Sequence, residues 1–388
     1  GPLFLPLSPG PEGDSEEHSE DWPGVGREGR VKLRILLTGS HGYIGSVMRP
    51  MLEAAGHEVA GLDTLFYEGC DFGPVPAGEP LRRKDLRDME PRDLEGFKAV
   101  VHLAALCNDP IGDLNPALTE EINCRAGLRL AALAKDAGVE RFVFASSCSM
   151  YGAAGDQFAT EESPLRPLTP YAVSKVQTEE GLSRMADQRF SPVYMRNATA
   201  YGASPRLRID VVLNNLTAWA HCTGKVRIMS DGTPWRPLVH VEDICRAALA
   251  ALEAPREAVH NQAFNVGVDE ENYQVKDLAE IVRATVPGCS IEYAPGASAD
   301  RRDYRVDFSK IRRALPGFQP RWNARLGAAQ LESAFSLNRF GMADLQGRRY
   351  TRLLQLRHLM DAGALDSELR WRTSTEQQAA AASRRDLS

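Results

Sequence analysis

The chain has 388 residues, of which 43% are hydrophobic and 25% charged, and its formal net charge is −6. This acidic balance argues against a nucleic-acid or anionic-membrane surface, and no apolar run approaches the roughly 18 residues of a membrane span. Seven cysteines are scattered without metal-ligand spacing, so we expect reduced thiols, no metal site and a cytoplasmic globular protein of one large or two modest domains.

The first thirty residues are unlike the rest of the chain. They are rich in Pro, Gly, Glu and Ser and offer little to bury, so we expect residues 1–30 to be a disordered leader. The opening LFLPL is too short, and lacks the basic flank, for a secretion signal.

The first predicted element is a buried parallel strand, Val31 to Leu37, because its apolar run shows no polar alternation. Three glycines follow at positions 39, 42 and 45. Helical spacing of apolar residues then extends from Tyr43 to Ala55, and the segment HEVAGLD is a second strand that ends at Asp63.

Each part of this unit suits a dinucleotide. Gly39 permits a tight turn, Gly42 lets backbone N–H groups approach a pyrophosphate, and Gly45 lets the helix pack close to the strand. The helix N-terminus attracts the phosphates. Asp63 lies where a carboxylate can accept hydrogen bonds from both adenosine ribose hydroxyls, and it would repel a 2′-phosphate. The stretch predicts NAD rather than NADP; the alternative is a βαβ unit without ligand.

The next buried strand is predicted from Ala99 to Leu106. The loop after it, residues 107–116, should face the substrate because ligands bind outside the carboxyl ends of parallel strands. Asn108 and Asp109 are candidate contacts there, or else turn formers before Pro110. A helix over 119–138 and a strand over 141–147 continue the alternation, which predicts an α/β fold with a doubly wound parallel sheet of the Rossmann type.

The candidate catalytic residues lie at and after the end of the strand that finishes at Ser147. Pro170 begins a long amphipathic segment, which places Tyr171 and Lys175 one helical turn apart on one face. A phenol with a pKa near 10 is a poor base at neutral pH, but a neighbouring ammonium favours its phenolate. Lys175 would also hydrogen-bond the nicotinamide ribose, and Ser147 would hold the reacting hydroxyl. The alternative is an ordinary surface pair.

From Val31 to Leu315 the chain resembles the extended short-chain dehydrogenase/reductase family, in its nucleotide-sugar epimerase and dehydratase branch. The resemblance rests on TGSHGYIG, HLAA, SSCSMYG, YAVSK, TAYG and PLVHVEDI, in that order. It implies an NAD-binding Rossmann domain over 31–200, to which 233–262 return, and a smaller C-terminal substrate-binding lobe over 201–232 and 263–322.

The resemblance also implies a catalytic set of Ser147, Tyr171 and Lys175, tightly held NAD, transient oxidation of a sugar carbon, and a homodimer formed by the helices near 119–138 and 174–186. The implied cofactor contacts are Gly39, Gly42, Tyr43, Ile44, Gly45, Asp63, Asp85, Leu86, Leu103, Ala104, Ala105, Tyr171 and Lys175. The implied contacts to a nucleotide-diphosphate sugar are Asn108, Asp109, Ser149, Asn215, Arg236 and Arg302. The alternative for each arginine is a solvated surface charge.

Departures from the family pattern bear on the reaction. Family 4,6-dehydratases carry Thr-Asp-Glu where this chain has Ser147-Cys148-Ser149, and family decarboxylases tend to keep a Glu at the Ser149 position. A 4-epimerase needs no second acid or base, so it is the simplest prediction. Cys148 could instead move a proton at C3 or C5, or be a small buried residue.

Other reactions of the family stay open: 3,5-epimerase, reductase, decarboxylase or dehydratase. A rival of another class is a non-catalytic NAD-binding scaffold or redox sensor, against which the intact triad argues.

The last part of the chain exceeds the family core. Residues 323–372 are predicted to form a helical extension, with Leu353, Leu356, Leu359 or Met360, and Leu365 as an apolar stripe. We expect it to pack on the substrate lobe or a partner subunit. Residues 373–388 should form a flexible tail.

Overall fold

The computed structural model describes residues 32–74, 81–107, 109–153, 157–294, 303–373 and 375. Its centre is a seven-stranded sheet in which every neighbouring pair is parallel, in the order β11-β7-β5-β4-β1-β2-β3. The first strand lies near the middle and the order reverses beside it, as in the doubly wound dinucleotide-binding fold. The strands are β1 (Arg34–Thr38), β2 (Glu58–Asp63), β3 (Leu81–Arg83), β4 (Ala99–His102), β5 (Arg141–Ser147), β7 (Ser191–Asn197) and β11 (Gln262–Val266).

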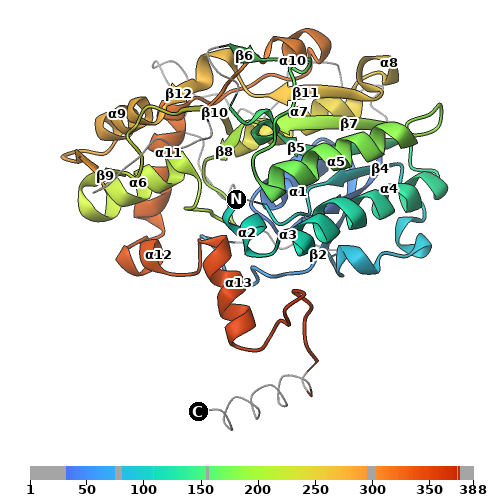
Figure 1. Ribbon diagram of the computed structural model, residues 1–388, viewed down its shortest axis with the longest axis horizontal. Coiled ribbons are helices and arrows are strands. Elements are labelled where there is room, and N and C mark those ends of the chain that lie inside the picture. Colours follow the sequence, from blue (N-terminus) through green and yellow to red (C-terminus); the bar gives the residue numbers. More distant parts are fainter. Residues whose placement is uncertain are drawn as a thin grey trace, which may run out of the picture.

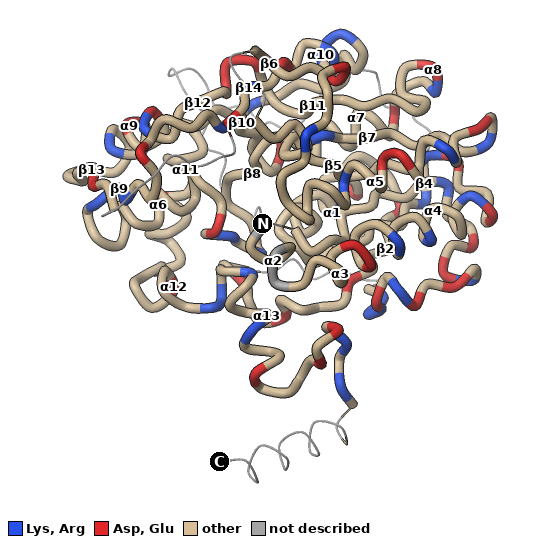
Figure 2. Tube along the Cα trace, viewed as in Figure 1, with Lys and Arg blue, Asp and Glu red and all other residues tan. Residues whose placement is uncertain are grey.

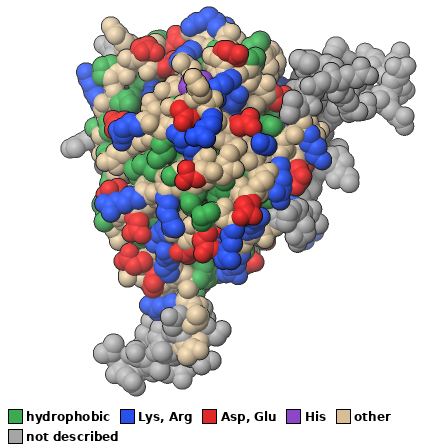
Figure 3. Space-filling model, turned by 90° about the vertical axis from the view of Figure 1, so that its right-hand side faces the viewer, with side chains coloured by type: hydrophobic (Ala, Val, Ile, Leu, Met, Phe, Trp, Pro, Cys, Tyr) green, Lys and Arg blue, Asp and Glu red, His purple; other side chains and the backbone are tan. Residues whose placement is uncertain are grey.

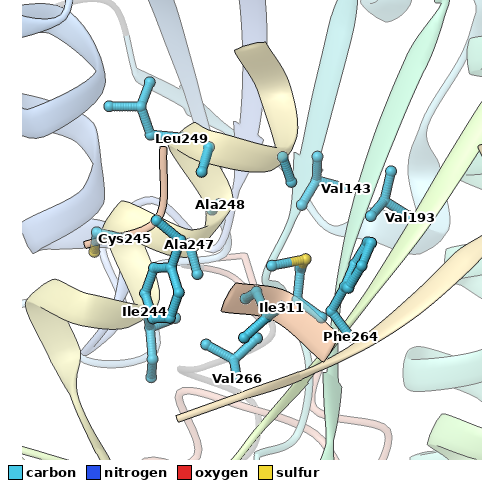
Figure 4. Packing of buried hydrophobic residues seen from close by; sticks show 14 of the residues in the cluster. Val143, Val193, Ile244, Cys245, Ala247, Ala248, Leu249, Phe264, Val266 and Ile311 are labelled. Carbon is cyan, nitrogen blue, oxygen red and sulfur yellow. The ribbon is translucent and has the colours of Figure 1, made fainter. Parts of the chain in front are cut away.

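Helices cover both faces of this sheet, because successive strand residues point to opposite sides. Ile35 and Leu37 pack on the face covered by α1 (Gly45–Ala54), α7 (Val241–Glu253) and α10 (Ser309–Ala314). Leu36 packs on the other face, with α4 (Ala126–Asp136) and α5 (Pro170–Met185). Figure 4 shows α7 residues such as Ile244 and Ala247 packed toward strand residues Val143 and Phe264. The predicted α/β fold with a Rossmann-type sheet is confirmed.

The smaller lobe lies beside the carboxyl ends of the strands (Figure 1). It contains a three-stranded sheet and a two-stranded parallel sheet, packed against three helices through an apolar cluster around Leu213, Leu238 and Leu278. Its elements are β8 (Thr199–Tyr201), β9 (Lys225–Ile228), β10 (Trp235–His240), β12 (Asn272–Gln274), β13 (Ser290–Tyr293), α6 (Val212–Thr223), α9 (Val275–Thr285) and α11 (Ala324–Leu337). Short β6 (Phe158–Ala159) pairs with β14 (Arg305–Val306).

Two boundaries differ from the domain prediction. The strand β10 pairs with β8 and β12 and so belongs to the smaller sheet, and the chain returns to the large sheet only with α7. The strand β11 is paired with β7 along its whole length to Val266, so the large sheet keeps residues that were assigned to the lobe. Alternation of apolar residues cannot tell which sheet a short strand joins, because that depends on its partners.

The segment 119–138 is helical but not uniformly α-helical. A π-helical turn, Glu120–Arg125, joins α3 (Pro116–Thr119) to α4. The preceding helix α2 spans Asp109–Leu114. Short 3-10 turns occur at Leu86–Asp88, Pro91–Leu94, Cys148–Tyr151 and Asp269–Glu271, and a short α8 at Arg256–Val259.

The C-terminal extension is helical only in part. After α11 come α12 (Met342–Gln346) and α13 (Arg352–Asp361), and the helical prediction to residue 372 is wrong beyond Asp361. Gly363 and Leu369 have φ values of 75° and 54°, which a helix cannot contain. The chain instead forms a closed loop in which Leu365 bridges Trp371.

The two halves of the extension pack on different parts of the molecule. Leu331 and Phe335 of α11 pack with lobe residues such as Leu207, as expected. Leu356, Leu365 and Leu369 are at most 2% exposed and pack with a different set, from the segments that follow β2 and β4 of the large sheet. That set is Phe66, Leu106, Ile111, Leu118 and Ile122. Figure 1 shows α13 and the loop after it below α2 and α3. The extension therefore bridges the lobe and the cofactor-binding domain.

Within the described ranges no helix combines the length and apolar character that crossing a bilayer requires, and no group of three or more His, Cys, Asp or Glu residues is arranged to hold a metal ion. All seven cysteines are free. On the face drawn in Figure 3, basic and acidic side chains are interspersed with apolar ones. The leader 1–30, and the tail apart from Thr373 and Thr375, lie outside the described residues.

Candidate active site

The glycine-rich turn between β1 and α1 has the geometry that the sequence predicts. Gly39 has a φ of 72°, and a Cβ there would lie 2.9 Å from the backbone nitrogen of Ala104. A Cβ on Gly45, the first residue of α1, would collide with the carbonyl oxygen of Gly39 and lie 2.7 Å from the Cα of Ser40. Gly42 would meet only that same oxygen, at 3.1 Å. Gly39 and Gly45 are thus needed for close packing within the turn, and Gly42 keeps its outer side clear.

Asp63 stands at the carboxyl end of β2, facing this turn. Its Oδ2 accepts from the backbone N–H of His41 at 2.9 Å, and its Oδ1 accepts from that of Leu65 at 2.8 Å. These bonds fix the carboxylate and leave acceptor capacity on both oxygens. Such an acid beside a glycine turn suits a ribose diol.

Asp85 and Leu86 form the start of the short turn after β3. Arg87 binds both oxygens of Asp85, with its Nη2 at 2.7 Å from Oδ2, and Arg370 of the extension lies 3.3 Å from the same oxygen. Burial alone would raise the pKa of Asp85, but the hydrogen bonds and charges of Arg87 and Arg370 outweigh it and lower the pKa. Asp85 is therefore an anchored carboxylate.

The end of β4 lies directly against the glycine turn. The backbone N–H of Leu103 donates to Thr38 O at 3.2 Å, and that of Ala104 lies 3.3 Å from Thr38 Oγ1. Leu103, Ala104 and Ala105 are all partly exposed. The strand ends at His102 rather than at Leu106 as predicted, because Leu106 directs both backbone polar groups to the Asn123 side chain.

Lys175 and Tyr171 converge at the end of β5. The Lys175 ammonium donates to Ala145 O at 2.7 Å, which ties α5 to the strand two residues before Ser147. It lies 5.6 Å from the centroid of the Tyr171 ring and 4.7 Å from that of Phe144. Burial lowers the pKa of Lys175 to about 8, against the opposing charges of Cys107 and Glu179. A buried ammonium beside a phenol ring is the pairing that the sequence predicts.

Ser147 is the last residue of β5 and is partly exposed. Its Oγ donates to the hydroxyl of Ser149 at 2.9 Å and accepts from the Ser149 backbone N–H at 3.2 Å. The two hydroxyls form a neutral pair at the carboxyl edge of the sheet. Neither position supplies a carboxylate.

Cys148 points the other way. Its side chain is fully buried, and its Sγ donates to Arg196 O at 3.0 Å on the neighbouring strand. Burial raises the pKa of the thiol well above its usual value. The acid–base role considered for Cys148 therefore has no support in this structure, and the small-residue interpretation fits its place in the core.

The predicted substrate contacts are less uniform. Asn215, in the first turn of α6, donates from Nδ2 to Ile209 O at 2.9 Å. Arg236 is 9% exposed on β10 and donates to Trp235 O at 2.7 Å. Both side chains are held by local backbone groups. Asn108, the Asp109 side chain and Arg302 lie outside the described residues.

Sequence reasoning missed two elements that organise this region. Asn123, on the π-helical turn, bonds Leu106 in both directions and donates to Ser174 Oγ at 3.2 Å, next to Lys175. π-turns are frequent at functional sites. The signal was a single amide among the apolar positions of the predicted helix.

The second missed element is an ion pair between a buried arginine and a largely enclosed carboxylate. Arg208 binds Asp210 at 2.8 Å and lies 3.4 Å from the carbonyl oxygen of Cys107, at the start of the loop predicted to face the substrate. The spacing Arg-Ile-Asp was visible, but nothing local indicated its burial.

A groove of about 560 Å³ lies elsewhere, between α5, β7 and β11. It is lined by charged residues such as Glu180, Arg184 and Lys310, and by none of the residues predicted for the site. It does not contribute to the predicted chemistry.

The residues present fit a bound dinucleotide. The glycine turn keeps backbone close to the start of α1, the fixed carboxylate of Asp63 ends the adjacent strand, and the ammonium of Lys175 lies beyond β4 at the end of β5. An anionic pyrophosphate at the helix start and a diol at the acid match these groups. Their order along the sheet edge, from β2 through β1 and β4 to β5, matches the order of the parts of NAD, from adenosine through pyrophosphate to nicotinamide.

Comparisons with known proteins agree with this geometry. Residues 35–267 match the model of the NAD dependent epimerase/dehydratase family. A UDP-glucose 4-epimerase of Corynebacterium glutamicum is 30% identical over 307 residues, which are 74% of this chain and 91% of that protein. A solved NAD-dependent NDP-hexosamine 5,6-dehydratase of tunicamycin biosynthesis has a TM-score of 0.71 at 26% identity, covering 79% of this chain and 98% of the other.

The UDP-glucose 4-epimerase of Thermotoga maritima, solved with UDP-glucose, has a TM-score of 0.69 at 26% identity and covers 79% of this chain and 99% of the other. The family match spans more than half of the 388 residues. This chain is an NAD-dependent enzyme and belongs to the NAD dependent epimerase/dehydratase family.

Proposed function

We propose that the protein is a nucleotide-sugar 4-epimerase that acts through a transient 4-keto sugar. The observation that carries this proposal is the site at the end of β5. Lys175 is buried beside the Tyr171 ring, and the following positions supply only the neutral hydroxyls of Ser147 and Ser149. This set can oxidise and re-reduce a carbinol, and it contains no carboxylate for eliminating water.

Each residue has one task in this reaction. Tyr171, as phenolate, removes the proton of the C4 hydroxyl, and Lys175 stabilises that phenolate by its charge. Ser147 donates a hydrogen bond to the same sugar oxygen, in place of its bond to the Ser149 hydroxyl. The chemistry that NAD supplies when bound is reversible hydride transfer at C4, outward from one face of the sugar and back to the other. Tyr171 then gives the proton back, so the proton and hydride that leave the sugar both return to it.

The turn of the sugar between the two hydride transfers needs a fixed anchor. Asn215, Arg236 and Arg302 are proposed to hold the diphosphate, since a guanidinium matches phosphate oxygens in two-point contacts. Support comes from the Thermotoga relative, whose structure contains UDP-glucose. Arg236 is nearly buried on β10 and rigidly held, as an anchor should be.

The test is turnover of a panel of UDP-, dTDP- and GDP-hexoses in deuterated water, followed by NMR. We expect inversion at C4 with the carbon-bound hydrogen retained. Exchange of hydrogen at C3 or C5 would instead show enolisation and favour a 3,5-epimerase or a dehydratase. No turnover of any sugar by folded, NAD-loaded protein would contradict the proposal and favour a non-catalytic scaffold.

Two further proposals concern the setting of the enzyme. We infer a homodimer through α4 and α5, which lie next to each other on one face of the sheet in Figure 1. We infer a cytoplasmic location, which the seven free thiols support because a reducing compartment keeps cysteines unpaired. Light scattering on the purified protein and fractionation of its host test them.

A further inference from the structure

The loop Leu365–Arg372, which follows α13, is held in a defined conformation by its own hydrogen bonds. Asp366 Oδ1 accepts from the backbone N–H groups of Glu368 and Arg370 at 2.9 and 2.8 Å, and Arg372 N donates to Ala364 O at 3.0 Å. Leu365 and Leu369 are 1% and 2% exposed. The loop is therefore closed on itself and pinned to the domain by two buried leucines.

Its polar contacts go to two neighbouring loops at the carboxyl edge of the sheet. Trp371 Nε1 donates to Thr64 O at 2.6 Å, directly after Asp63. Arg370 lies 2.6 Å from Asp88 and 3.3 Å from Asp85, both in the loop after β3. The charged residues of the loop are visible in the lower part of Figure 2.

Two side chains of the cofactor-binding domain also contact the loop and strengthen its attachment. Arg87, which holds Asp85, also donates to the carbonyl oxygen of Glu368 at 2.9 Å. The guanidinium of Arg83, at the end of β3, lies 4.9 Å from the Trp371 ring centroid. The loop thus contacts the carboxyl ends of β2 and β3, the two strands that border the predicted adenosine site.

The loop lies near the C-terminal end of the chain, beyond residue 267, where the family match ends. The structural matches cover 98% and 99% of the two solved relatives but only 79% of this chain, so about a fifth of this chain has no counterpart in either. The loop thus lies beyond the matched family region and contacts the edge at which that region is predicted to bind its cofactor.

We propose that the loop Leu365–Arg372 is a cofactor-retention element: it forms the outer wall of the adenosine site and slows the release of NAD. Arg370 is a positioning residue that acts through Asp85, and Trp371 is one that acts through Thr64. The proposal rests on the proposed assignment of Asp63 and Asp85 to adenosine. Slow release suits a reaction that must return each hydride to the sugar it came from.

The test measures NAD release from full-length purified protein. Bound NAD is quantified after heat denaturation, and its release is timed by a dehydrogenase and its alcohol substrate, which trap free NAD as NADH. Arg370→Ala and Trp371→Ala should each release NAD about tenfold faster than the wild type, because each loses a contact that fixes the pocket wall. Arg370→Lys, which keeps the charge, should restore part of the retention.

Arg357→Ala is the matched control, because Arg357 is an exposed arginine of the same extension. Thermal unfolding shows whether each variant is folded. Folded Arg370→Ala and Trp371→Ala proteins that release NAD at the wild-type rate would overturn the proposal. If Trp371→Ala does not fold, Trp371→Phe, which keeps the ring and loses the N–H donor, replaces it. Wild-type protein that neither contains nor binds NAD would contradict the cofactor assignment itself, a distinct result.

Discussion

The cofactor half of the site and the substrate lobe differ in what determines their geometry. In the cofactor half, the geometry is determined mainly by backbone conformation, because Gly39 and Gly45 lie where no side chain fits. In the lobe, side chains fix the geometry through partners far away in the sequence, as when Gln330 Oε1 accepts from the backbone N–H of Ala203 and lies 2.8 Å from His240 Nε2. A site built on backbone geometry can be predicted from a motif, whereas one built on long-range partners cannot.

The largest effect is expected at the point where both halves meet the substrate. Tyr171→Phe should lower turnover by roughly 10²–10⁴-fold, because it removes the acid–base group and leaves the hydride path intact. NAD content should not change. Steady-state kinetics and released NAD measure the two effects separately. Tyr293→Phe, at a tyrosine that is 50% exposed, is the control. Equal turnover in Tyr171→Phe and wild type would remove Tyr171 from the mechanism.

A single added methyl group at Gly45 is expected to disrupt the glycine turn of the cofactor half. Gly45→Ala should destabilise the protein by about 3 kcal/mol and abolish NAD retention, since the new Cβ collides with backbone that cannot move aside. Urea unfolding and bound NAD are the measurements. Gly341→Ala meets no atom within 4 Å and should behave as wild type. If Gly45→Ala kept its NAD, the turn would be less constrained than the structure indicates.

Arg236→Gln tests the substrate lobe, where Arg236 is proposed to bind the diphosphate. Loss of one charged contact to a diphosphate should raise KM by roughly 30-fold, about 2 kcal/mol, while kcat falls much less. Arg313→Ala, on the exposed side of α10, is the control. A fall in kcat with unchanged KM would instead place Arg236 near the reacting carbon.

The difference between local backbone geometry and long-range contacts also explains which parts of the fold and the site could be predicted from the sequence. The sheet, the glycine turn, Asp63 and the Tyr171–Lys175 pair came from local spacing, and the parallel sheet and family are confirmed. The burial of Arg208 and Asp210 and the bonds of Asn123 depend on residues 17 to 101 positions away. The loop at 365–372 escaped prediction because the apolar stripe runs on to Leu365, past Gly363, whose φ of 75° follows the actual end of the helix.

A smaller effect is expected in the pH dependence of stability. The folded pKa of Lys175, about 8, lies below its ordinary value of 10.5. Below pH 8 both states are protonated and folding bears the full cost of burying the charge. Between pH 8 and 10.5 the unfolded state binds more protons, so stability rises with pH. Lys175→Met should be more stable than wild type by about 1–2 kcal/mol at pH 7, and the gap should close by about pH 10.

Urea unfolding of the two proteins at several pH values measures that gap, because other titrating groups cancel in the difference. A gap that is constant from about pH 7 to about pH 10 would show that Lys175 keeps an ordinary pKa in the fold. The phenol of Tyr171 would then lack the strongly desolvated ammonium that its activation requires.

The smallest effect is expected for Cys148→Ser, and it separates the rival reactions. The thiol is fully buried and bonds a backbone carbonyl that a hydroxyl can also reach. Turnover should therefore change by less than about threefold and stability by about 1 kcal/mol. Loss of turnover together with loss of solvent deuterium uptake at C3 or C5 would require the thiol to turn out of the core toward the sugar. Because the Cys148 thiol points into the core, away from the hydrogen-bonded hydroxyls of Ser147 and Ser149, unchanged turnover in Cys148→Ser would leave the end of β5 with groups that serve hydride transfer alone.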